Sequence, residues 1–317
     1  MEQLDLCRWT QPAVILVATD LNDLGRLMPV AIEQAGQSGA RLILLHVVAT
    51  APILSTDAAG LPYYDAASVL EFADRTLLPW CASAQRQGIA CDALVREGNP
   101  AQQVAAAARQ FQADRVLLGT RSRSKLSKLL LGSVAEQVLR SVNLPVITVG
   151  PEAHLPVEEE EAGPQVVLYA TTLRETSRPS AVLACQFAAN YKQHLVLLHV
   201  LPPIDEMKRN GVPSALDSAA AHELLNLATM ARAEAGLTVE PLLLHGNPAI
   251  EILATAVERC ASLIVLGSTH RSAFENLTRD RTVYRVLAHA RCPVLTLREP
   301  LLQPAEIDED RFATSHR

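Results

Sequence analysis

The residues best suited to bind a ligand lie in one segment rich in cations and small residues. Four cations stand between Arg121 and Lys128, and the next acidic residue is Glu136, although the whole chain has a formal net charge of −6. Gly132 and Ser133 follow this basic loop at the start of a helical pattern. Glycine lets an anion approach the backbone closely, and the N–H groups and dipole of a helix N-terminus favour negative charge. The segment therefore favours a bound phosphate.

The same residues also fit a structure without a ligand. Ser133 and Glu136 have the spacing of a capping box, in which two side chains satisfy N–H groups at the start of a helix. Cations in a loop are usually solvated and bind nothing. The residues alone leave both interpretations open, so the position of the segment in the fold has to decide between them.

Short β-branched apolar runs alternate with longer helical patterns through the first half of the chain. This alternation is typical of an α/β fold, here a doubly wound, Rossmann-like domain with a five-stranded parallel sheet. If the strand order is 3-2-1-4-5, a ligand crevice lies between the first and fourth strands, which end at Asp20 and Gly119. We predict strands at 13–19, 41–48, 91–96, 114–119 and 145–149, and helices at 25–38, 66–88, 100–112 and 133–141.

The second half of the chain repeats the first. Arg96–Pro100 recurs as Leu244–Pro248, and Asn143–Val149 recurs as Arg291–Leu297, each 148 residues later. Two copies of one domain explain the common offset. The predicted organisation is a domain at 1–150, a proline-rich acidic linker at 151–164, a second domain at 165–299 and a disordered tail at 300–317.

Composition limits the class of protein. The longest apolar runs fall far short of the roughly 20 residues that span a bilayer, and the N-terminus lacks the pattern of a secretion signal. The six cysteines form no C-x-x-C pair and no cluster with metal-ligand spacing, as expected of free thiols in a reducing compartment. The net acidic charge argues against a general nucleic-acid binder. We expect a cytoplasmic protein that contacts neither membrane nor nucleic acid.

The ordered motifs resemble those of the universal stress protein family over nearly the whole chain except the linker and tail. ATP-binding members of that family carry G-x2-G-x9-G-[S/T] between the fourth strand and the last helix, and an Asp at the end of strand one. The first domain has Asp20 and reads Gly119-x2-Ser122-x9-Gly132-Ser133. If Ser122 must adopt a positive φ, serine costs about 1 kcal/mol relative to glycine, so we expect weakened rather than abolished binding.

The resemblance implies that the first domain binds ATP, and it leaves open whether Mg²⁺ accompanies the nucleotide. Residues at three strand ends would contact the adenine, and residues around the last helix would hold the ribose and phosphates. The implied contacts to the base are Thr19, Asp20, Val47 and Leu118, and those to the ribose and phosphates are Gly119, Ser122, Gly132, Ser133 and Val134.

The second copy departs from this pattern where an anion would bind. Thr172 replaces the strand-one Asp, and the loop ends in Asp280-Arg281 where the first domain has glycine and serine. A carboxylate at that position repels a phosphate while it still caps the helix. We therefore predict a second domain with a degenerate site and a structural or regulatory role.

Two function classes remain. The first is a nucleotide-binding stress-response module, and the alternative is an interaction module that binds no nucleotide and acts through its paired domains. No P-loop, pyrophosphatase or kinase motif is present, so we expect no enzyme, although slow ATP hydrolysis stays open. His46 and His199 recur in the second strands, where we predict structural histidines.

The resemblance also implies how the two domains meet. Their fifth strands, Pro145–Val149 and Pro293–Leu297, would pair about a pseudo-two-fold axis, because apolar edge strands need a cover. The chain would then be an internal dimer of its own domains. Whether it pairs again with a second chain is left open.

Overall fold

The helices and strands of the first domain lie within two or three residues of their predicted bounds. The computed structural model describes residues 8–49, 66–120, 131–153, 165–173, 178–203, 215–269 and 281–299, so Ser122 with its basic loop, most of the linker, Asp280 and the tail lie outside the described residues. The elements of the first domain are β1 (Val14–Thr19), α2 (Leu24–Ser38), β2 (Arg41–Val48), α3 (Ala66–Arg86), β3 (Cys91–Glu97), α4 (Pro100–Gln110), β4 (Arg115–Gly119), α5 (Ser133–Ser141) and β5 (Val146–Val149).

The second domain repeats these elements in the same order. Asn99 and Asn247 cap α4 and α8 in the same way, because each side chain accepts a hydrogen bond from a backbone N–H of the first turn. The elements are β6 (Val166–Ala170), α6 (Arg178–Asn190), β7 (His194–Leu201), α7 (Ala215–Ala235), β8 (Val239–His245), α8 (Pro248–Glu258), β9 (Ala261–Thr269), α9 (Arg281–His289) and β10 (Val294–Glu299).

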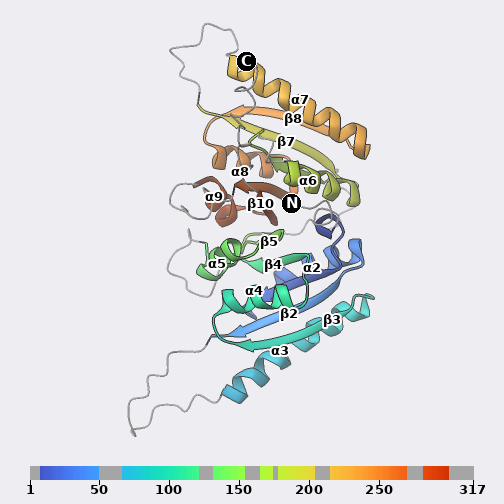
Figure 1. Cartoon of the computed structure of the whole chain (residues 1–317), viewed down its shortest axis with the longest axis vertical. Coiled ribbons are helices and arrows are strands. Elements are labelled where there is room, and N and C mark those ends of the chain that lie inside the picture. Colours follow the sequence, from blue (N-terminus) through green and yellow to red (C-terminus); the bar gives the residue numbers. More distant parts are fainter. Residues whose placement is uncertain are drawn as a thin grey trace, which may run out of the picture.

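The strands of both domains form one continuous sheet in the order β3-β2-β1-β4-β5-β10-β9-β6-β7-β8 (Figure 1). Within each domain neighbouring strands are parallel and follow the order 3-2-1-4-5. The predicted doubly wound fold is therefore confirmed for both copies.

The domains join through their fifth strands, as predicted. β5 and β10 are antiparallel, with Ile147 opposite Leu295 at the centre of the pairing. The flanking threonines bond reciprocally, since Thr148 Oγ1 donates to the Val294 carbonyl and Thr296 Oγ1 donates to the Val146 carbonyl, both at 3.3 Å. All of these residues are buried. The pairing removes the edge strand that each domain would otherwise expose.

Helices cover both faces of the sheet. Along β1, Ile15 and Val17 face α2 and α3, whereas Leu16 faces α4 and α5. Each of these apolar layers continues into the second domain, where α6 and α7 extend the first layer and α8 and α9 extend the second. The core is built mainly from Leu, Val, Ile and Ala, as the low aromatic content requires.

A buried arginine also links the two domains. Arg115 at the start of β4 is 2% exposed, and its guanidinium lies 4.7 Å from the ring centre of Phe187 in α6. It donates to Gln34 Oε1 at 2.5 Å and to the Trp9 carbonyl at 2.7 Å. The neutral partners and the ring face compensate much of the cost of burying this cation. Its position explains why a charged residue starts a buried strand.

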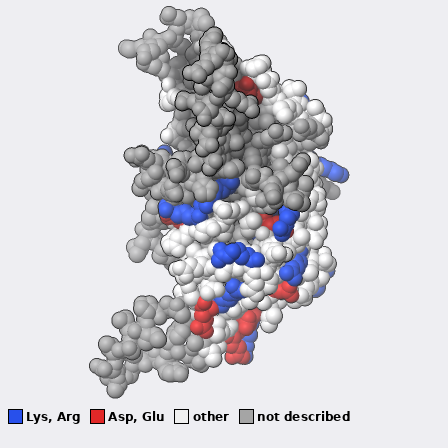
Figure 2. Space-filling model, in the orientation of Figure 1, with Lys and Arg blue, Asp and Glu red and all other residues white. Residues whose placement is uncertain are grey.

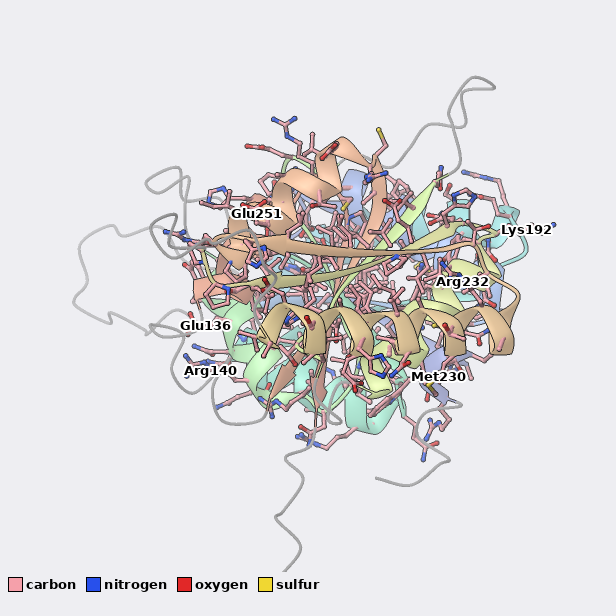
Figure 3. The ribbon with its side chains drawn as sticks, turned by 90° about the horizontal axis from the view of Figure 1, so that it is seen from above. Glu136, Arg140, Lys192, Met230, Arg232 and Glu251 are labelled. Atoms are coloured by element: carbon pink, nitrogen blue, oxygen red, sulfur yellow. The ribbon has the colours of Figure 1, made fainter. Side chains whose placement is uncertain are left out.

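The described part of the surface in Figure 2 carries Lys, Arg, Asp and Glu side chains intermixed, without a broad area of one sign. In Figure 3, Glu136 and Glu251 lie on one side of the molecule, whereas Lys192 and Arg232 lie on the opposite side. The two glutamates belong to the first turns of α5 and α8. Because helix N-termini lie at the carboxyl ends of parallel strands, both domains open toward the same side of this view.

Candidate functional site

A cavity of about 230 Å³ lies at the carboxyl ends of β1, β2 and β4, beside the N-terminus of α5. This is the crevice expected for the observed strand order. Ser122 lies outside the described residues, and the structure brings the other predicted site residues together in the lining of this one cavity. They are Thr19, Asp20, Val47, Leu118, Gly119, Gly132, Ser133 and Val134.

The turn after β1 has a tightly specified shape. Leu21 has a φ of 71°, which is uncommon for a leucine, and its N–H donates to Thr19 Oγ1 at 2.9 Å. Asp20 Oδ1 accepts from the Asn22 N–H at 2.9 Å, and Asn22 Nδ2 donates back to the Asp20 carbonyl at 3.0 Å. These bonds hold the Asp20 carboxylate at the rim of the cavity.

Asp23 is a cavity residue that the sequence analysis missed. It is the N-cap of α2 and is 4% exposed. Its Oδ1 accepts from Thr19 Oγ1 at 2.5 Å and from the Asp20 N–H at 3.3 Å. Burial raises the pKa of Asp23 to about 6; the hydrogen bond from Thr19 opposes this rise and the nearby Asp20 carboxylate adds to it. Asp23 could have been recognised as a site residue from the sequence, because it stands four residues after Thr19 and directly before an amphipathic helix.

Replacing Asp23 by asparagine is expected to flatten the pH dependence of stability. A folded-state pKa above the ordinary 3.8 means that the folded protein holds a proton which the unfolded chain has lost. This stabilisation is present below pH 4 and disappears as the pH rises through about 6. The free energy of unfolding of Asp23→Asn, compared with that of the wild type, should therefore rise by about 2 kcal/mol between pH 4 and pH 8. Urea unfolding at both pH values measures this gain, and equal changes in the two proteins would contradict it.

The N-terminus of α5 has no capping side chain. Gly132 is the N-cap, with φ −62° and ψ 141°, and Ser133 is the first helical residue. The capping box, one of the two interpretations that the sequence left open, is therefore not formed. Glu136 instead pairs with Arg140 at 2.7 Å, and Figure 3 shows the two side chains next to each other on α5. The first N–H groups of α5 face the cavity side of the helix without a side-chain acceptor from its N-cap.

Backbone and inter-domain contacts set the position of Gly132. Its N–H donates to the Thr120 carbonyl at 2.7 Å, directly after β4. The preceding Leu131 N–H donates to the Tyr284 hydroxyl of α9 at 2.9 Å, so the second domain supports the residues just before α5 of the first. The helix begins at Ser133, as predicted, and these contacts hold the preceding Gly132 in extended backbone.

Thr120 is a second residue that the sequence analysis missed. It lines the cavity and is 1% exposed. Within the described parts of the chain, its Oγ1 has no hydrogen-bond partner. A buried hydroxyl without a partner costs free energy, so a ligand atom with hydrogen-bonding capacity would be favoured beside it. Its place directly after Gly119 was the signal in the sequence.

The recurring histidines have a structural role, as predicted. His46 Nδ1 lies 2.9 Å from the Thr19 carbonyl, and His199 Nδ1 lies 2.8 Å from the Thr171 carbonyl. Each therefore ties the end of a second strand to the end of a first strand. His46 also lines the cavity, next to Val47.

The second domain keeps the turn after its first strand but not the carboxylate. Leu173 has a φ of 58°, and its N–H donates to Thr171 Oγ1 at 3.0 Å, as Leu21 does to Thr19. Thr172 stands at the position of Asp20. The backbone of the site is thus duplicated while its acidic group is lost.

A larger cavity, of about 380 Å³, lies at the junction of the two domains. Its polar side chains bond mainly to each other: Ser262 Oγ and Gln193 Oε1 are 2.5 Å apart, and Gln193 Nε2 donates to Gln165 Oε1 at 2.6 Å. Gln34 bonds to the Tyr191 hydroxyl in the same way. Gln165, Ser262 and Leu263 in its lining lie at the amino ends of β6 and β9, whereas a ligand crevice forms at the carboxyl ends, so we regard this cavity as a gap in inter-domain packing.

No group of three or more His, Cys, Asp or Glu side chains among the residues that the structure describes is placed to hold a metal ion. Among the described helices, none combines the length and the apolar character that crossing a membrane demands.

Comparisons with known proteins agree with the fold. The model of the universal stress protein family matches residues 13–150 and 164–298. A universal stress protein of Methanocaldococcus jannaschii is 28% identical over 136 residues, which are 43% of this chain and 80% of the relative. One of Thermus aquaticus is 32% identical over 140 residues, which are 43% of this chain and 96% of the relative. Each relative thus matches less than half of this chain.

A solved structure shares the two-domain arrangement. The crystal structure of a universal stress protein from Archaeoglobus fulgidus has a TM-score of 0.71 at 21% identity, and the match covers 92% of this chain and 98% of that one. The similarity shows a common fold across both domains. Together with the two matches to the family model, it establishes that the chain belongs to the universal stress protein family and carries two tandem copies of the family's domain.

Proposed function

We propose that the first domain binds an adenine nucleotide, ATP, in the 230 Å³ cavity, and that the second domain binds none. The observation that carries the proposal is the meeting of three strand ends and an N-terminus without a side-chain cap in one cavity at the switch point of the sheet. Apolar walls with a few polar groups are the usual lining of small-molecule sites. The chemistry of the two ends of the cavity differs, and each end suits a different part of the nucleotide.

The strand end of the cavity suits the base. Val47 and Leu118 supply apolar surface for a flat ring, and Asp20 supplies a carboxylate at the rim. A carboxylate accepts hydrogen bonds and donates none when ionised. The exocyclic amine of adenine is a donor and fits this position, whereas the carbonyl oxygen of guanine at the same place would face an acceptor. The site should therefore prefer ATP to GTP.

The helix end of the cavity suits the phosphates. Gly132 leaves room beside the backbone, and the first N–H groups of α5 and the helix dipole favour an anion. The Ser133 hydroxyl and the Thr120 hydroxyl line the same end. In the second domain an aspartate and an arginine, Asp280 and Arg281, replace the glycine and the serine. The carboxylate would repel a phosphate, so we assign nucleotide binding to the first domain alone.

The proposed activity is binding rather than catalysis. His46 in the cavity lining is bonded to a backbone carbonyl, and the Asp23 carboxylate accepts hydrogen bonds from Thr19 Oγ1 and the Asp20 N–H, so both groups already have structural partners. A bound nucleotide would affect the second domain through the contact that Leu131 makes with Tyr284, because this contact joins the residues just before α5 to α9. Because the chain belongs to the universal stress protein family, we propose that it serves as a stress-response module of the cytoplasm.

Calorimetric titration tests the proposal. ATP added to the purified full chain should bind with a stoichiometry of one per chain, and GTP should bind at least about tenfold more weakly, because in the same orientation its O6 acceptor takes the place of the amine opposite Asp20. Asp20→Thr, which copies Thr172 of the second domain, should reduce this preference. Absence of heat with ATP would refute the proposal and would favour an interaction module that needs no nucleotide. A stoichiometry of two would refute the assignment to one domain.

A further inference from the structure

Two cysteine side chains meet where α3 packs on β3, an edge strand of the sheet. Cys81 lies on the buried side of α3 and Cys91 begins β3, and their Sγ atoms are 2.8 Å apart. The residues are 4% and 3% exposed. Gln85, one helical turn after Cys81, donates to the Cys91 carbonyl at 2.9 Å and fixes the helix to the strand beside the sulfurs. The sulfurs of a disulfide lie about 2.05 Å apart, so bond formation needs only a small closing movement.

The second domain builds the same contact without cysteine. Val239 matches Cys91, because it pairs with Leu195 in β7 as Cys91 pairs with Leu42 in β2. The buried residues of the two helices recur with identical spacing, so Ala228 is the counterpart of Cys81 in the second domain. They are Ala73, Leu77, Cys81 and Ala84 in α3, and Ala220, Leu224, Ala228 and Ala231 in α7. Alanine and valine therefore suffice to pack this helix on this strand. Packing alone does not explain two facing thiols in the first domain.

We propose that Cys81 and Cys91 form an oxidisable dithiol, which a hydroperoxide converts into a reversible disulfide that ties α3 to β3. The proposal is independent of the nucleotide site, because neither cysteine lines that cavity. It would give the first domain, and not the second, a disulfide between this helix and this edge strand.

The contact between the thiols assigns their roles. The Cys91 thiol donates to Cys81 Sγ, and this hydrogen bond lowers the pKa of Cys81. The same hydrogen bond, together with burial, raises the pKa of Cys91. Cys81 is therefore the thiolate that reacts first, since the thiolate is the nucleophilic form of cysteine.

The reaction balances in two steps. The Cys81 thiolate attacks a peroxide oxygen, the O–O bond breaks, and a sulfenic acid forms on Cys81 while the leaving oxygen takes up the thiol proton. The Cys91 sulfur then attacks the Cys81 sulfur, the S–S bond forms, and the hydroxyl leaves with the Cys91 proton as water. Two thiols lose two electrons and two protons, and hydrogen peroxide is reduced to two molecules of water. An external dithiol reverses the change by thiol–disulfide exchange.

Peptide mapping after peroxide treatment of the full chain tests the proposal. Cleavage after arginine separates the cysteines, because Cys81 lies in the fragment Thr76–Arg86 and Cys91 in the fragment Gln87–Arg96. We expect these two fragments to be recovered as one disulfide-linked species that a reducing agent separates again. Closing so short a loop should also raise the thermal unfolding midpoint of the oxidised protein by roughly 5 °C.

Matched variants come from the second domain. Cys81→Ala copies Ala228 and Cys91→Val copies Val239, so both should fold like the wild type, which their unfolding midpoints under reducing conditions will show. Neither should give the linked species. In Cys91→Val a sulfenic-acid reagent should label Cys81 more slowly than in the wild type trapped before the disulfide forms, because the variant lacks the hydrogen bond that lowers the pKa of Cys81. The exposed Cys260 serves as an internal comparison. Oxidation of Cys260 without a Cys81–Cys91 link, or linkage of either residue to another cysteine, would overturn the proposal.

Discussion

Gly132→Asp is expected to weaken ATP binding at least about 100-fold, because it places a carboxylate within a few ångströms of the proposed phosphate position. The change copies Asp280 of the second domain. Gly132 has φ −62° and ψ 141°, a backbone that any residue adopts, so the variant introduces no backbone strain. Aspartate is also a favourable N-cap. The helix should therefore be as stable as before while its anion site is lost.

Gly132→Asn is the matched control for this prediction. Asparagine has nearly the shape of aspartate and caps helices equally well, but it is uncharged. It should keep most of the affinity, and both variants should unfold at or above the wild-type midpoint. Titration of ATP into the three proteins separates charge from bulk. Equal binding by Gly132→Asp and wild type would show that the phosphate does not bind at the N-terminus of this helix. Equal losses of affinity in both variants would show that the volume of the side chain, and not its charge, causes the effect.

Much of the fold could be predicted from periodicity and repetition. β-branched runs such as Val14–Thr19 are buried on both faces, so their composition identifies them without long-range information. The common offset between the copies then fixed the domain organisation. The pairing of β5 with β10 followed from family resemblance, and the reciprocal bonds of Thr148 and Thr296 give it a physical basis.

The details of the site could be predicted less completely. Strand order locates the crevice, and hence Asp20 and Gly119, but it does not reveal which neighbouring side chains turn inward. Asp23 is buried because the turn at Leu21 folds the chain back onto β4. The choice between a capping box and an uncapped helix start was open for a similar reason, since the contact between Leu131 and Tyr284 joins residues 153 positions apart. Such long-range contacts leave no periodic signal in the sequence.

The two copies show which parts of the site are structural. The turn at Leu21 and Leu173 and the histidine contacts occur in both domains, so the backbone frame does not depend on a ligand. The acidic residue and the glycine of the helix start occur in the first domain alone. The frame therefore serves the fold, and the side chains that differ are those to which we assign nucleotide binding. A tandem arrangement lets one copy support the other, as Tyr284 does for Leu131.

Gly119→Ala is expected to destabilise the protein by about 3 kcal/mol, through overpacking and the loss of a buried hydrogen bond. A Cβ atom at this position would lie 2.3 Å from Asp23 Oδ2, so the carboxylate has to move. Moving it breaks the bond from Thr19, and burial leaves the carboxylate little space. If this contact is the cause, removing the Asp23 carboxylate should relieve the cost. Gly119→Ala should then cost under about 1 kcal/mol in an Asp23→Ala background.

Gly36→Ala provides the control with the opposite sign. Gly36 lies inside α2, and a Cβ atom there meets nothing within 4 Å. Alanine in place of glycine should therefore stabilise the helix by about 1 kcal/mol. Urea unfolding of the wild type, Gly119→Ala, Asp23→Ala and the double variant gives the interaction energy between positions 119 and 23. Gly36→Ala is measured beside them. The same cost for Gly119→Ala in both backgrounds would show that something other than Asp23 excludes a side chain at the end of β4.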